Sequence, residues 1–218
     1  MRALALAVAL VAAPVAPVAA RALPADSARA PHAPHAAAAS AAELKTMLNT
    51  LLQEHVYLAA GATGAALGGR APEFRAAAAA LDGNSQDIAK AIGSVYGADA
   101  GTAFLGLWRR HIGFVVDYTT GLATKDVAKQ TQAVNALLGY TQEFAAFLAG
   151  ANPNLPKDAV ADLVKTHILT LKDVIDAQAS KDPQKTWTAL RMAGMHMSMI
   201  ANPLADAIVK QFPSRFAN

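Results

Sequence analysis

The sequence predicts an all-α protein, a six-helix bundle with an internal pseudo-two-fold duplication, preceded by a signal peptide and a flexible linker. Two observations support this fold class. From residue 42 onward, apolar residues recur at the spacing of helices, and no stretch alternates in the manner of a strand. The chain is 54% hydrophobic but only 6% aromatic, which is typical of closely packed helices. Its 218 residues suit one domain of ordinary size.

Residues 1–20 have the layout of a secretory signal peptide. An arginine near the start is followed by an apolar stretch and then by small residues, and cleavage is expected after Val18-Ala19-Ala20. The alternative is an uncleaved anchor. The apolar run before Pro14 is too short to cross a bilayer comfortably, so we expect no stable membrane span after signal cleavage. The sequence thus predicts a secreted or periplasmic protein.

Residues 21–41 are rich in alanine and proline and have no periodicity, which is typical of a flexible linker. His32 and His35 lie in this segment, where a solvated linker is a better explanation than a weak metal site. The bundle domain is therefore assigned to residues 42–218.

Six helices are expected within that domain. Glycine, and Asp182 followed by Pro183, mark their boundaries. Pro156 and Pro183 lie near the first turns of the last two helices, where the missing N–H costs nothing. The predicted ranges are 42–68, 71–95, 99–122, 126–150, 157–179 and 184–211.

Residues 81–126 align without gaps onto residues 137–182, an offset of 56 residues. The aligned pairs include histidine at positions 111 and 167 and aspartate at positions 117 and 173, which alanine bias does not explain. The second and third helices therefore resemble the fourth and fifth. The first helix is paired with the sixth through His55 and His196, a weaker correspondence. Bundles of this kind often place a site between facing helices.

Four helices each carry one histidine within the apolar stripe that is expected to face the core: His55, His111, His167 and His196. Each unsatisfied buried polar group costs about 1–3 kcal/mol, so four buried imidazoles require partners. Imidazole is the commonest metal ligand. A shared metal ion, two ions, a haem, or an internal network with acids and waters would each satisfy them.

Sulfur ligands could join these histidines. Met192 and Met199 lie four residues before and three residues after His196, on the same helical face. A mixture of histidine and methionine without cysteine favours copper, with zinc next. The alternative is that methionine fills gaps in the core.

Oxygen groups are candidates for orienting the histidines. Ligating imidazoles usually hydrogen-bond a carboxylate or carbonyl through their second nitrogen. Asp117 and Asp173 are the paired candidates, although their spacing turns them toward a neighbouring helix. Tyr118 shares the face of His111, whereas Glu54 points to a different face from His55.

The sequence carries no P-loop, no nucleotide-binding glycine motif, no Glu-x-x-His pair and no nucleophile motif, and it has no cysteine. We therefore expect no enzymatic activity, or only a metal-dependent one. The formal charge of +3 is dispersed, so no nucleic-acid partner is expected. The predicted function is transition-metal binding by an exported cell-envelope protein. The alternatives are a structural or interaction module with a ligand-free histidine network, and non-covalent bis-histidine haem binding.

Overall fold

The computed structural model describes residues 40–216 of the chain. The predicted signal peptide and nearly all of the predicted linker, including His32 and His35, lie outside the described residues. The elements are α1 (Ala41–Leu67), α2 (Ala71–Tyr96), α3 (Ala98–Thr124), α4 (Val127–Ala151), α5 (Lys157–Ala179), α6 (Pro183–Gln211) and the short 3-10 helix η1 (Pro213–Arg215).

The predicted all-helical bundle is confirmed, and between residues 40 and 216 no strand occurs. Every helix begins and ends within about two residues of its predicted bounds. Several N-termini are capped by side chains. Ser40 and Glu43 form a reciprocal capping box at α1, while Asp126 and Asp182 accept hydrogen bonds from the first turns of α4 and α6.

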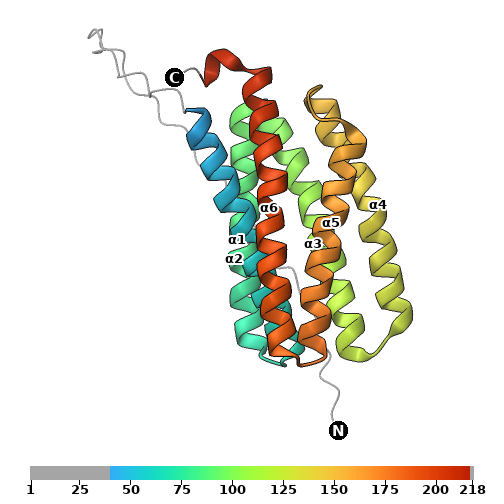
Figure 1. Ribbon diagram of the computed structural model, residues 1–218. Coiled ribbons are helices and arrows are strands. Elements are labelled where there is room, and N and C mark those ends of the chain that lie inside the picture. The colour runs from blue at the N-terminus through green and yellow to red at the C-terminus, as the bar shows by residue number, and fades with distance from the viewer. Residues whose placement is uncertain (1–39, 217–218) are drawn as a thin grey trace, which may run out of the picture. The chain divides into compact units, whose positions relative to one another are not determined.

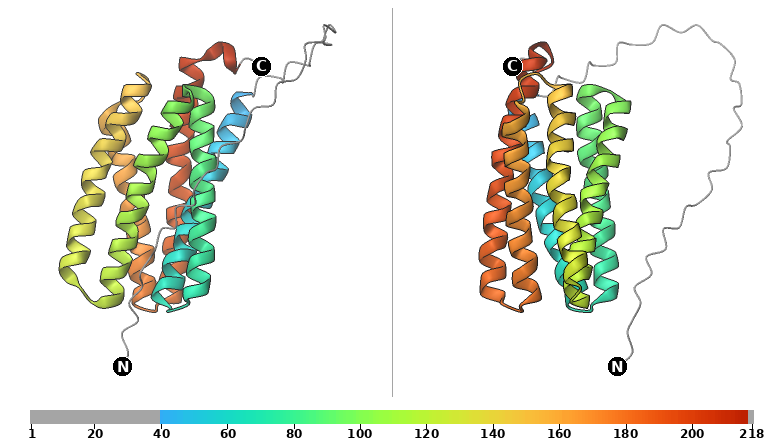
Figure 2. Two further views of the ribbon diagram at one scale, coloured as in Figure 1. Left: turned by 180° about the vertical axis from the view of Figure 1, so that it is seen from behind. Right: turned by 90° about the vertical axis from the view of Figure 1, so that its right-hand side faces the viewer.

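The six helices run up and down one long axis (Figures 1 and 2). Each helix packs against its neighbours in the chain, and α6 also packs against α1, so the helices close into a ring. The odd-numbered helices α1, α3 and α5 additionally contact one another. They therefore form the inner wall of the bundle. None of the described helices is long and apolar enough to cross a bilayer.

The bundle consists of three consecutive helical hairpins whose loops have the same geometry. The loop residues Gly69, Lys125 and Lys181 all have left-handed backbone angles, with φ of 70°, 58° and 58°. In each loop the next residue donates a backbone hydrogen bond to a carbonyl five residues earlier, at Ala65, Gly121 or Ala177. Corresponding positions in successive loops are 56 residues apart.

This recurrence is consistent with the predicted resemblance of α2 and α3 to α4 and α5, but it replaces the predicted pairing of α1 with α6. The 56-residue offset between α3 and α5 extends one unit further back, to α1. His55 therefore corresponds in position to His111 and His167, not to His196. His196 corresponds to Asn84 on α2 and Tyr140 on α4. The sequence comparison missed the first unit because few of its residues are identical to their equivalents. Leu51 and Leu107 are one of the few identical pairs.

Candidate metal centre

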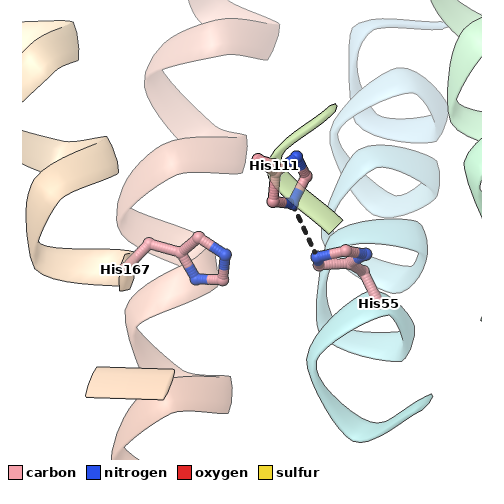
Figure 3. A group of neighbouring side chains, drawn as sticks. All are labelled: His55, His111 and His167. Carbon is pink, nitrogen blue, oxygen red and sulfur yellow. Dashed lines mark hydrogen bonds between the residues drawn. The ribbon is translucent and has the colours of Figure 1, made fainter. Parts of the chain in front are cut away.

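Three histidines converge at the centre of the bundle. His55 on α1, His111 on α3 and His167 on α5 offer one ring nitrogen each, and these three atoms lie within 4.8 Å of one another. Figure 3 shows the three rings approaching the same space from three different helices. Because the inner helices carry them at equivalent positions, the fold brings together residues that are 56 positions apart.

The spacing of these nitrogens suits a metal ion. The Nε2 atoms of His55 and His111 are 3.4 Å apart. Two imidazoles bound tetrahedrally at the usual distance of about 2.0–2.1 Å place their nitrogens about 3.3 Å apart. His55 and His111 are thus already at ligand spacing. His167 lies within 4.8 Å of the other two ligand atoms, so it would complete the set with a shift of up to about 1.5 Å.

Burial keeps all three imidazoles neutral. The exposed fractions of His55, His111 and His167 are 1%, 3% and 6%. Burial, reinforced by repulsion from the other two histidines, holds the pKa of His55 well below its usual value. Burial and the nearby His167 lower the pKa of His111 to about 3, and burial and His196 lower the pKa of His167 to about 4. Neutral imidazole is the form that binds metals.

Part of the hydrogen-bonding capacity of the three rings is unused. The Nδ1 atoms of His55, His111 and His167 are buried and have no partner among the described residues. The contact between His55 and His111 satisfies only their Nε2 atoms. Each unsatisfied group costs about 1–3 kcal/mol, so these three Nδ1 atoms destabilise the folded protein. An ion held through the Nε2 atoms would leave the Nδ1 atoms as they are, so the structural sign that the trio can hold an ion is the convergence of its rings.

Aromatic side chains enclose the trio. The Trp108 ring lies 4.8 Å from His55 and 4.6 Å from His111, and the Tyr140 ring lies 5.1 Å from His111, measured between centroids. The Tyr140 hydroxyl is buried without a partner among the described residues. Sequence reasoning did not single out Tyr140. The signal that identifies it is its position, 56 residues before His196.

His196, the fourth predicted ligand, lies outside the trio. It is buried, with 7% of its surface exposed, but its Nε2 atom is 2.9 Å from the carbonyl oxygen of Leu163. The equivalent Asn84 donates a hydrogen bond to the carbonyl of the equivalent Leu51. His196 thus links the outer helix α6 to the inner helix α5, as Asn84 links α2 to α1. The Nε2 atom of His196 already has the Leu163 carbonyl as its partner.

The methionines singled out as ligands face solvent. Met192 and Met199 are 61% and 58% exposed, whereas His196 points inward from the same helix. Met197, which was not singled out, is instead the methionine that the fold buries, at 1% exposure. Met192 and Met199 are rotated away from His196 around the helix axis. His196 can therefore face the core while both methionines face solvent.

The predicted oxygen groups also lie apart from the trio. Asp117 pairs with Lys129 at the surface, and Asp173 is exposed. Glu54 is exposed and accepts a hydrogen bond from Asn84. Tyr118 is buried but donates its hydroxyl hydrogen bond to Asp176 at 2.5 Å. The group of neighbouring candidate ligands in the described chain contains histidine alone.

Two small cavities adjoin the trio, and His111 and His167 border both. One has a volume of about 20 Å³ and extends toward Tyr118 and Lys172. The other, of about 40 Å³, is lined almost entirely by apolar side chains, Met197 among them. Sites for drug-sized ligands usually measure about 300–1,000 Å³. A haem would therefore have to separate the inner helices, whereas a single ion would require only a shift of His167.

No protein-family model, curated protein or solved structure matches this chain.

Proposed function

We propose that this protein binds one transition-metal ion through His55, His111 and His167, and that the ion is copper. The observation that carries the proposal is the convergence of three buried, neutral imidazoles with ring nitrogens within 4.8 Å. Copper(II), zinc, iron and nickel all accept imidazole ligands, and copper has the highest affinity among the divalent ions. Zinc is the next candidate.

The absence of negative charge at the trio favours copper in its monovalent form. The described candidate ligands include no carboxylate, and the surrounding side chains are apolar or aromatic. The electrostatic cost of burying an ion grows with the square of its charge, so an uncompensated divalent ion is far more costly here than Cu⁺. The buried side chain of Met197 borders the cavity of about 40 Å³ next to the trio. Its thioether is a soft group suited to Cu⁺.

Metal retention by the full-length protein tests the proposal. The purified chain is incubated anaerobically with Cu⁺, and in parallel with Zn²⁺, then desalted and assayed for bound metal. We expect one copper ion per chain, and loss of that copper in His111→Leu and in a His55→Leu/His167→Leu double variant. Leucine is chosen because it removes the ligand while keeping a buried apolar side chain of similar size.

Two matched variants control for other histidines. His196→Leu changes another buried histidine, and His32→Ala/His35→Ala removes those of the N-terminal segment. Both variants should retain one copper ion. Circular dichroism verifies that each variant remains helical. If the wild-type chain retains no metal, or if helical His111→Leu retains as much copper as the wild type, the proposal is wrong.

A ligand-free polar network is the second candidate function. The 3.4 Å contact between His55 and His111 and the contact of His196 with the Leu163 carbonyl favour it. In this case the histidines make a structural or interaction module sensitive to acid, because protonation of buried imidazoles opposes folding. A folded wild-type protein that retains neither copper nor zinc would support this candidate.

We further propose that the protein is exported to the periplasm or the outside of the cell, and the composition of residues 1–20 supports this. Expression of the full chain followed by fractionation and intact-mass measurement tests it. We expect an exported product that begins at Arg21. A full-length product retained in the cytoplasm would contradict export.

A further inference from the structure

The larger cavity beside the trio is enclosed by equivalent residues from all three hairpins. Its walls include three sets whose members are 56 residues apart along the chain. The inner helices supply one set: Leu52, Trp108 and Val164. The outer helices α2, α4 and α6 supply the other two: Ile88, Phe144 and Ile200, and one turn further along, Ile92, Leu148 and Leu204. The cavity therefore lies between the inner helices, about one helical turn from the histidines. His111 and His167 line it, so an ion bound at the trio would have this cavity beside it.

Unequal side chains create this cavity. At the inner level next to the histidines, α1 and α3 supply Leu52 and Trp108, whereas α5 supplies the smaller Val164. The resulting space has a volume of about 40 Å³, enough for a molecule of two or three atoms. Apart from the two histidines, Tyr140 and Trp108 are the lining residues that carry polar atoms, and the surface of the cavity is almost wholly apolar.

The chemistry of these walls selects the occupant. Apolar cavities hold water poorly unless two to four polar partners are present, and they bind small apolar molecules instead. An anion would be buried here without a cation, since no arginine or lysine lines this cavity. An uncharged diatomic molecule meets neither obstacle.

We propose that the fourth coordination position of the metal binds a small uncharged diatomic molecule, of the class of O₂, NO or CO, held in the 40 Å³ cavity. This inference rests on the proposed metal binding. A metal at the trio would supply the bond to the molecule, and the apolar walls would exclude water and anions.

Carbon monoxide is the probe, because it binds Cu⁺ and its stretching vibration is visible in the infrared. The full-length protein is loaded with Cu⁺, its copper content is measured, and it is titrated with CO. We expect one CO per copper. Val164→Ile, which adds one methylene at the smallest wall position, should weaken CO binding about tenfold or more with copper retention unchanged. Val174→Ile, a buried valine of α5 that does not line the cavity, is the matched control and should bind CO as the wild type does.

The outcomes separate this inference from the metal proposal. If the wild type retains no copper, the metal proposal itself fails. If it retains copper but gives no CO band, or if Val164→Ile and Val174→Ile bind CO equally, the diatomic site is refuted. A CO band that appears only in Met197→Leu would also refute it, because Met197 would then hold the fourth position itself.

Discussion

Acid should destabilise the metal-free protein through its three buried histidines. Their folded-state pKa values lie below the ordinary value of 6.5, at about 3 for His111, about 4 for His167 and well below 6.5 for His55. Between these values and 6.5 the unfolded chain binds protons that the folded chain does not. The contribution of these neutral histidines to the free energy of unfolding is therefore complete above about pH 6.5. It decreases as the pH falls toward 4.

The size of this effect follows from proton linkage. Between pH 7 and pH 5, each histidine that stays neutral in the folded state lowers the free energy of unfolding by about 2 kcal/mol. The three together give about 6 kcal/mol, which is comparable with the whole stability of many domains, about 5–15 kcal/mol. Replacing His111 by leucine should remove about one third of this dependence.

Urea unfolding followed by circular dichroism measures the effect in metal-free protein. Titrations at pH 7, 6 and 5 should show midpoints that fall steeply for the wild type and less steeply for His111→Leu. At pH 7 the variant should have nearly the stability of the wild type, because it removes the unsatisfied Nδ1 atom of His111 but leaves the Nε2 atom of His55 without its partner. A wild-type midpoint that does not change between pH 7 and 5, or equal pH dependence in both proteins, would refute the reasoning.

Three further predictions concern stability, measured by urea unfolding at pH 7. Asp126→Ala removes the N-cap of α4 and should cost about 1 kcal/mol, with copper retention unchanged. Gly101→Ala should lower the free energy of unfolding by about 1–3 kcal/mol, because its Cβ would lie 2.8 Å from the carbonyl oxygen of Ala89. Gly106→Ala on the same helix should raise it by about 0.5–1 kcal/mol, because its Cβ would meet nothing within 4 Å. Free copper at 100 times its Kd should add about 2.7 kcal/mol to the wild type and nothing to His111→Leu; an equal gain in both would place copper elsewhere.

The helices and the burial of the histidines were predictable from the sequence, because both depend on local spacing. Apolar residues at helical intervals fix which side of each helix faces the core, and His55, His111, His167 and His196 all lie on that side. Burial alone does not show which of these side chains meet. His196 faces inward from an outer helix, so it reaches the Leu163 backbone and not the centre.

The distinction between inner and outer helices was the missing information. It depends on how three hairpins pack together, and it could have been inferred had the 56-residue offset been extended back to Leu51 and His55. The solvent exposure of Met192 and Met199 has a simpler cause. A residue at i−4 or i+3 shares a face with His196 only approximately, and the boundary of the core runs between them.

The placement of the trio at equivalent positions has a physical consequence for any ion that binds there. No two of the three histidines belong to the same hairpin, so the unfolded chain cannot bring them together without closing two loops of about 56 residues. Binding energy at the trio is therefore almost entirely selective for the folded bundle. Equivalent positions also make the three histidines alike, while the side chains next to them differ, as Leu52, Trp108 and Val164 do. The repeated backbone thus accounts for the convergence of the three histidines, and the unequal neighbours account for the cavity beside them.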